Sequence, residues 1–194
     1  MTKPHRTPDP GLSYGEGRDA LLRAAVVVVA RSGLRGLTYR AVADEAGVAH
    51  ALVRHHFGSR DALIVAATEY SLAVAIETGG LTSDSTDLAD FAAGTGAVLV
   101  EAADLTAFQF EVILESRRRP ELRPAVAGLY AGFRSAALED LRQRGVDADE
   151  ALGVLVFAAL DGLVFQGLAL DEPEVTEAAL AALRRLLALD AAAR

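Results

Sequence analysis

The chain has 194 residues, 52% of them hydrophobic, and a formal net charge of −8 at pH 7. A chain of this length and apolar content buries a substantial core, which excludes global disorder. It has no cysteine, which excludes disulfides and thiolate metal sites.

The charge is divided unevenly along the chain. Residues 1–60 contain nine Lys or Arg and five Asp or Glu, a net charge of +4, whereas residues 61–194 carry −12. All four histidines also lie in the first part. A basic first part can meet phosphates, while an acidic remainder keeps the protein soluble and limits indiscriminate contact with nucleic acid.

The first half of the chain predicts four helices. Alanine and leucine dominate and strand signals are few, so we expect an all-α protein of about nine helices. Residues 1–17 lack the apolar segment of a secretory signal and are expected to form a flexible arm. Helices follow at about 18–32, 38–46, 49–56 and 59–77, with Gly33 and Gly47 at turns and Thr38 and Ser59 as N-caps.

The second half predicts five more helices. Two glycines and the polar run 82–87 indicate a loop between domains. Helices are expected at about 87–103, 106–118, from Pro120 and Pro124 to before Gly145, at 147–170, and from Pro173 to about 190. The chain is therefore divided into the arm at 1–17, a helical head at 18–63, a connecting helix and hinge at 64–80, and a larger helical domain at 81–194.

One segment is apolar enough to require a comparison with membrane spans. Ala151–Leu170 is a 20-residue, almost unbroken apolar run, the length that crosses a bilayer. Asp161 lies near its centre, however, and both flanks are acidic with no Lys or Arg. A helix that is apolar on all sides and buried within a bundle or dimer fits these residues better.

The segment from Leu34 to Leu63 has the pattern of a helix-turn-helix. Val42, Ala43 and Ala46 form the apolar face of a short helix, and Gly47 can take the left-handed conformation that a tight turn needs. The next helix places apolar bulk on one side and polar groups on the other, and it is short enough to enter a major groove about 12 Å wide.

The exposed groups of this segment suit DNA. Arg54 can read guanine with two hydrogen bonds or hold a phosphate, and the histidines can donate to bases or phosphates. Tyr39 and Arg40 open one helix and Ser59 and Arg60 open another, where backbone N–H groups favour phosphate. His56 is expected to be mainly a packing residue. The candidate DNA contacts are Thr38, Tyr39, Arg40, Ala49, His50, Ala51, Arg54, His55, His56, Ser59 and Arg60.

A set of these residues resembles the signature of the TetR (tetracycline-repressor-type) family. The set comprises Thr38, Val42-Ala43, Ala46-Gly47-Val48, His56-Phe57 and Ser59-Arg60-Asp61-Ala62-Leu63, within a match of about 45 residues from Arg18 to Leu63. In many members a tyrosine precedes the His-Phe pair by two residues. Here that position is Arg54, so either Arg54 or His55 takes the role of the tyrosine.

The resemblance implies a ligand cavity and a homodimer. The cavity is expected within the helices of the second domain, near aromatic residues and buried polar groups. For Asp161, a ligand role and an internal hydrogen bond are equally expected. The candidate cavity residues are Phe91, Phe108, Gln109, Glu111, Phe133, Phe157, Asp161, Phe165 and Gln166. The last two helices are expected to pair with their copies through Gly153, Phe157, Leu160, Val164, Leu168, Val175, Ala179, Leu183 and Leu186.

The expected function is that of a cytoplasmic, ligand-responsive transcription regulator. It is most simply a repressor that a small apolar or cationic effector releases from a pseudo-palindromic operator. We expect no cofactor and no metal, because His50 and His55 do not share a helix face. We expect no enzymatic activity, because no catalytic motif is present. The alternative is a helical ligand carrier or protein-interaction module that does not bind DNA.

Overall fold

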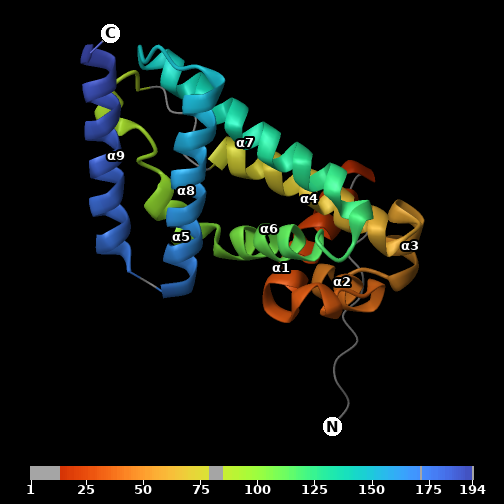
Figure 1. Ribbon diagram of the computed structural model, residues 1–194. Coiled ribbons are helices and arrows are strands. Elements are labelled where there is room, and N and C mark those ends of the chain that lie inside the picture. Colours follow the sequence, from red (N-terminus) through yellow and green to blue (C-terminus); the bar gives the residue numbers. More distant parts are fainter. Residues whose placement is uncertain (1–13, 79–84, 171, 194) are drawn as a thin grey trace.

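The computed structural model describes residues 14–78, 85–170 and 172–193. Within these ranges every regular element is a helix, which confirms the all-α prediction (Figure 1). The elements are α1 (Tyr14–Gly36), α2 (Tyr39–Ala46), α3 (His50–Phe57), α4 (Arg60–Thr78), the 3-10 turn η1 (Leu88–Asp90), α5 (Thr95–Glu101), α6 (Ala103–Glu115), the 3-10 turn η2 (Pro120–Leu122), α7 (Arg123–Gln143), α8 (Glu150–Leu170) and α9 (Pro173–Ala193).

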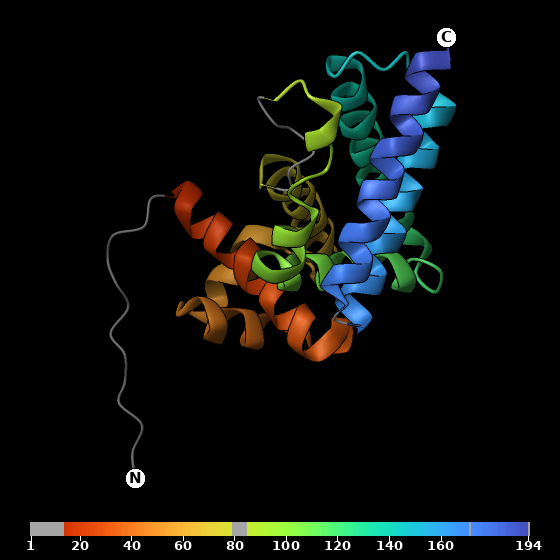
Figure 2. The ribbon, with the colours of Figure 1, turned by 90° about the vertical axis from the view of Figure 1, so that its left-hand side faces the viewer.

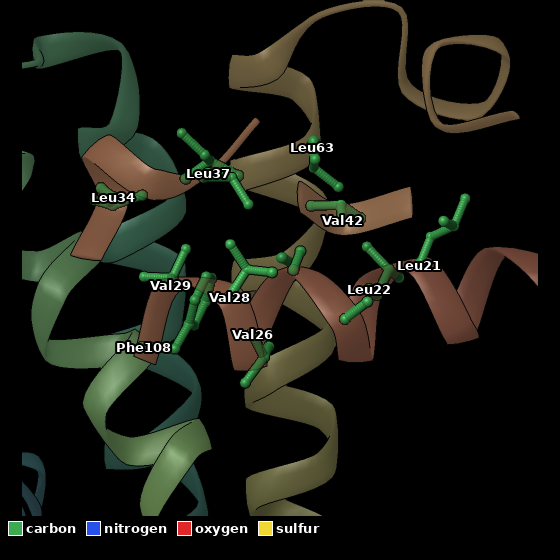
Figure 3. Packing of buried hydrophobic residues seen from close by; sticks show 14 of the residues in the cluster. Leu21, Leu22, Val26, Val28, Val29, Leu34, Leu37, Val42, Leu63 and Phe108 are labelled. Atoms are coloured by element: carbon green, nitrogen blue, oxygen red, sulfur yellow. The ribbon is translucent and has the colours of Figure 1, made fainter. Parts of the chain in front are cut away.

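The first three helices form a small head that closes on the start of α4. Leu21, Ala25 and Val29 recur at helical spacing on α1 and are each fully buried, which gives the helix one continuous core face. Figure 3 shows Val42 of α2 and Leu63 of α4 in the same cluster of buried side chains. The expected flexible arm lies outside the described residues up to residue 13, and the last part of it, from Tyr14, is helical.

The predicted caps of the head are present. Thr38 Oγ1 accepts a hydrogen bond from the backbone N–H of Ala41 at 3.1 Å, and Ser59 Oγ accepts one from Ala62 at 3.0 Å. Gly47 ends α2 in the left-handed region, at φ 69° and ψ 29°, where a side chain costs about 1–2 kcal/mol. Gly33 breaks the regular path of α1 at φ 65°, and a short turn carries the chain on to Gly36.

The fifth predicted helix is wrong in its first half. In place of one helix from residue 87, the structure has η1, a sharp break and then the short α5. The carboxylate of Asp87 caps only the 3-10 turn, through the N–H of Ala89 at 2.9 Å. Phe91 is fully buried, and its carbonyl accepts a hydrogen bond from Nε of Arg184 on α9 at 2.8 Å. These long-range contacts hold Ala92 at φ 53°, so tertiary structure overrides local helix propensity here.

The body is built around α4, α6, α7 and α8. In Figures 1 and 2, α8 and α9 lie side by side, and Figure 1 shows α3 at the opposite end of the molecule from them. Helices α4 and α7 pack along each other between these ends, and α6 packs against α1. Phe108 and Val112 of α6 are fully buried in the core of the head, so α6 joins the head to the body.

Candidate DNA-binding face and effector cavity

Helix α3 is anchored on one side and exposed on the other. Val53 is fully buried and Phe57 is 9% exposed, and these two residues lie four positions apart on the face that meets the head. His50, Ala51, Arg54 and His55 are all exposed. The helix therefore presents a short polar and basic face to solvent, held in place by an apolar opposite face.

The neighbouring helix ends add to this face. Thr38, Arg40, Ala49 and Ser59 are exposed, and Tyr39 is partly buried. The Tyr39 ring lies 6.1 Å from the ring of His50, centroid to centroid. The ends of α2 and α3 thus bring a phenol and an imidazole together beside the exposed side of α3.

Arg60 is held differently from the expectation. Its Nε donates a hydrogen bond to the carbonyl of Leu37 at 2.8 Å, and its Nη2 donates to the carbonyl of Leu34. The guanidinium therefore ties the start of α4 to the connection between α1 and α2. A guanidinium engaged with two main-chain carbonyls positions the head, and its contact with a DNA phosphate stays a prediction.

His56 is partly buried beside Phe57, in accord with a packing role. Burial lowers its pKa from the ordinary value, and the positive charges of His55 and Arg18 lower it further. Arg18 itself lies over the Phe57 ring, with its guanidinium carbon 5.6 Å from the centroid. These contacts favour the neutral imidazole of His56 in the free protein.

A largely apolar cavity lies between α4, α5, α6, α7 and α8. Among the lining residues that the structure describes, Asp161 is the one acid, and none is Lys, Arg or His. It is lined by Ala75, Thr78, Thr95, Val98, Ala102, Leu105, Thr106, Gln109, Phe110, Ile113, Leu129, Tyr130, Phe133, Phe157, Leu160, Asp161 and Val164. Concave, mostly apolar hollows with a few polar groups are typical of small-molecule sites.

The polar groups of the cavity are held by specific partners. The Tyr130 hydroxyl donates a hydrogen bond to the Asp161 carboxylate. Burial raises the pKa of Asp161, and the hydrogen bond from Tyr130 partly opposes this shift. Burial and the neighbouring Asp161 charge also raise the pKa of Tyr130. Gln109 Nε2 donates to the carbonyl and hydroxyl oxygens of Ser71, both at 3.2 Å.

Aromatic rings form one wall of the cavity. The rings of Phe133 and Phe157 are stacked at 5.5 Å with an interplanar angle of 12°. Tyr130 meets Phe157 edge-on at 5.7 Å. A flat aromatic ligand would find both ring faces and ring edges here.

The structure brings four of the nine predicted cavity residues to this cavity, namely Gln109, Phe133, Phe157 and Asp161. Phe108 points into the core of the head and Phe91 into a second core with α9. Glu111 lies on the opposite face of α6, where its carboxylate accepts a hydrogen bond from the N–H of Leu34 at 3.5 Å.

Two further predicted cavity residues lie at the outer side of α8. Phe165 is 47% exposed and packs edge-on against Phe110 at 4.8 Å. Gln166 is exposed and donates to the carbonyl of Gly162 at 3.2 Å. Phe110 and Tyr130 were missed as lining residues. The helical spacing of Thr106, Gln109, Phe110 and Ile113 was the available signal for Phe110.

The predicted dimer residues divide into two groups. Gly153, Phe157 and Leu160 face the interior of the protomer; a Cβ on Gly153 would lie 3.1 Å from Leu138 Cβ on α7. Val164, Leu168, Ala179 and Leu183 are half-buried, and Val175 and Leu186 are 58% and 64% exposed.

Large apolar side chains remain exposed beside that second group. Leu155 on α8 and Leu189 on α9 are 66% and 67% exposed. By length and composition α8 also qualifies as a possible membrane span, with 22% of its most apolar window buried. Exposed apolar side chains thus lie on both of these neighbouring helices. We call this set the α8–α9 face; it comprises Leu155 and Leu170 of α8 and Val175, Leu186 and Leu189 of α9.

Two family models match most of the chain. Residues 21–67 match the model for bacterial regulatory proteins of the TetR family, and residues 84–189 match the model for the C-terminal domain of tetracycline-repressor-like proteins. No curated protein matches the sequence.

Solved structures agree with these matches. A TetR-family regulator from Rhodococcus sp. is 25% identical with a TM-score of 0.73, covering 89% of this chain and 98% of its own. A TetR-family member from Streptomyces coelicolor A3 is 29% identical with a TM-score of 0.68, covering 89% of this chain and 96% of its own.

A third similar structure carries a ligand. The multidrug binding protein EbrR, solved with proflavin, is 30% identical with a TM-score of 0.61, and the match covers 88% of this chain and 99% of that one. EbrR has also been solved with ethidium, where the identity is 27% and the TM-score 0.63. With its exposed α3, its largely apolar cavity and both family models matched, this chain belongs to the TetR family of bacterial transcription regulators.

Proposed function

We propose that this protein is a dimeric transcription repressor that releases its operator when an aromatic cation enters the cavity. The observation that carries the DNA part is α3, which is fixed by Val53 and Phe57 and leaves Arg54 and His55 exposed. A rigid helix with an exposed basic face is what entering a major groove requires. A DNA partner also places the protein in the cytoplasm.

The DNA contacts follow from this placement. We assign base contacts to Arg54, His50 and His55, and backbone contacts to Tyr39, Arg40 and the exposed helix ends. We divide the chain into the head at 18–63, the connecting helix and hinge at 64–80, and the effector domain at 81–194. A helical ligand carrier without DNA binding is not favoured, because it leaves the exposed basic side of α3 without a role.

The α8–α9 face supports the dimer. An exposed apolar surface of this kind on a soluble protein marks an interaction site, and a two-fold axis through it presents α3 twice. Two recognition helices presented in this way fit half-sites about 34–36 Å apart, or somewhat more, on a pseudo-palindromic operator.

The cavity supports an aromatic cation as effector. Asp161 supplies one carboxylate among apolar walls, and Phe133, Phe157 and Tyr130 supply ring faces. A desolvated cation against aromatic rings and a carboxylate is held by cation–π attraction and charge pairing. EbrR, which binds proflavin and ethidium, makes these two dyes suitable probes.

Helix α4 provides the link between effector and DNA. Its start lies in the head, where Arg60 holds the α1–α2 connection, and its end, at Ala75 and Thr78, lines the cavity. A ligand changes a conformational equilibrium only through its differential affinity for the two states. An effector that binds better to one orientation of α4 therefore favours a dimer in which the two α3 helices no longer match the spacing of successive major grooves.

The test is release of operator DNA by ethidium or proflavin, measured with labelled duplex from upstream of the protein's own gene. Both dyes also bind DNA directly, so Asp161→Asn serves as the control that retains the DNA-binding face. The proposal is supported if the dye releases the wild-type protein from the operator at concentrations at which the Asp161→Asn variant stays bound to it. Equal release of both, or of neither, contradicts it.

A further inference from the structure

A second hollow lies directly beside the effector cavity. It runs between α1, the end of α4 and the junction of α5 with α6, and it is more open than the cavity. The two hollows share four lining residues, Thr78, Val98, Ala102 and Leu105. We call this second hollow the access groove.

We propose that the access groove is the route by which the effector reaches the cavity, and that Glu101 and Asp104 on its wall make this route selective for cations. The inference rests on the proposed function, because it assumes that the cavity takes an aromatic cation. Glu101 and Asp104 would then affect how fast the ligand passes into the cavity, and not how it is held once it is bound there.

The shared residues make a connection between the two hollows physically simple. The four shared side chains lie between the two hollows. They are no larger than leucine and come from the end of α4, from α5 and from the start of α6. Thr78, Val98 and Leu105 can change rotamer without any helix having to separate, and the methyl group of Ala102 occupies little space. Helix α5 has only seven residues and no side-chain cap at its start, so few local hydrogen bonds hold this wall in place.

The charges of the groove are asymmetric. Glu101 and Asp104 are exposed on the α5–α6 wall, next in sequence to Ala102 and close to Leu105, which line both hollows. Arg23 is the third charged residue of the groove and lies on the α1 wall opposite. Two acids beside an opening concentrate cations there, and this effect weakens as salt screens the field. A cation following the acidic wall then meets Asp161 inside the cavity.

The experiment measures the rates of ethidium binding and release by stopped-flow fluorescence, with full-length protein and no DNA. Ala97 lines the groove and not the cavity, so Ala97→Trp narrows the route without touching the bound ligand. We expect association and dissociation to slow by a similar factor, about tenfold, with the Kd unchanged. Val100→Trp on the same helix is the control, because Val100 is 81% exposed and lines neither hollow.

The second variant tests the charge. Glu101→Gln with Asp104→Asn is expected to lower the association rate of ethidium about three- to tenfold at low salt, with the difference disappearing at high salt. If Ala97→Trp and Val100→Trp bind and release ethidium at the same rates, the effector does not enter through the access groove, even though ethidium still binds to the protein. Unchanged association in the double variant contradicts the charge selectivity. Failure of the wild-type protein to bind either ethidium or proflavin contradicts the effector class and this inference together.

Discussion

Asp161 is the residue on which the choice of effector depends. Its carboxyl is half-buried among apolar side chains and accepts a hydrogen bond from Tyr130, and burial raises its pKa. Asp161→Asn keeps a similar shape and removes the charge. We expect at least about tenfold weaker binding of ethidium, measured by fluorescence titration, because the cation loses its counter-charge. Equal affinity in the variant would remove Asp161 from the site.

The same shift predicts how binding and stability depend on pH. The ionised carboxylate binds the cation, so ethidium affinity falls as the pH falls through the raised pKa of Asp161. A raised pKa in the folded state means that this group stabilises the fold at low pH, and that the contribution is lost as the pH rises through the folded pKa. Asp161→Asn is therefore expected to melt at the wild-type temperature or above it near neutral pH. A lower melting temperature would contradict the assigned cause of the shift.

Arg54 is an exposed cation on the solvent side of α3, the face that we propose binds DNA. If it reads a base, Arg54→Ala weakens operator binding by about 1–3 kcal/mol and relaxes specificity at one position of the site. Fluorescence anisotropy with the operator and with single-base variants measures both effects. Arg142→Ala is the matched control, because Arg142 lies at the end of α7, far from α3 (Figure 1). If Arg54→Ala binds the operator with unchanged affinity and footprint, Arg54 does not contact the DNA.

The sequence predicted the exposed face of α3 more fully than the cavity. A short helix with two apolar anchors leaves little freedom, so the periodicity of Val53 and Phe57 fixes which side Arg54 occupies. The cavity has no such constraint. Phe91, Phe108, Phe133 and Phe157 look alike in sequence, and only three-dimensional contacts separate the two that line the cavity from the two that fill cores.

At the scale of elements, α4 and α6 each touch both the head and the cavity. One side of α6 lines the cavity with Gln109 and Phe110, and the other packs Phe108 and Val112 into the head. The turn that follows α6 is tied to the start of α4, because Arg119 in this turn forms an ion pair with Asp61 of α4. Glu121 of η2 also pairs with Arg119, at 3.0 Å, and helps to orient it. We therefore expect a displacement of α6 by a ligand to act on α4 at two places, their direct packing and the Arg119–Asp61 pair.

Arg119→Ala tests this connection. We expect ethidium and operator each to bind the variant at close to wild-type affinity, but their mutual coupling to fall by about 0.5–2 kcal/mol. The measurement is the Kd for operator with and without saturating dye, with the dye's own effect on DNA subtracted. Arg118→Ala is the control, because Arg118 is exposed and, among the described residues, its ion pair is with Glu115 of α6, at 3.0 Å. Wild-type coupling in Arg119→Ala would place the transmission elsewhere.

Helix ends show where sequence reasoning succeeds and fails. Thr38 and Ser59 were predicted as caps because a hydroxyl followed by an apolar-periodic run has a local physical meaning. The predicted start of α8 was Asp147, but the helix begins at Glu150 and its cap is Asp149, whose carboxylate accepts a hydrogen bond from the N–H of Leu152 at 2.8 Å. Several acids in a row offer several possible caps. The break at Phe91 and Ala92 depends on Arg184, 93 residues away, and no local pattern contains it.

At the scale of the molecule, the account requires that two copies meet through the α8–α9 face. Leu155→Glu together with Leu186→Glu places charges on two exposed leucines of this face. We expect a monomer by sedimentation or light scattering and at least about tenfold weaker operator binding, because buried unpaired charges oppose association. Val100→Glu adds a charge to an exposed apolar residue of α5, which is not part of α8 or α9, and is expected to remain dimeric. A dimeric double variant would contradict the interface.

The central claim is that α3 holds DNA, and the salt dependence of operator binding tests it most directly. Titration of the wild-type protein onto duplex from upstream of its own gene, between 50 and 200 mM salt, reports the release of counterions from phosphates. The account predicts specific binding that weakens by about 10³–10⁵-fold across this range, as expected for roughly six to ten phosphate contacts. Binding that is absent, or that does not change with salt, would contradict it.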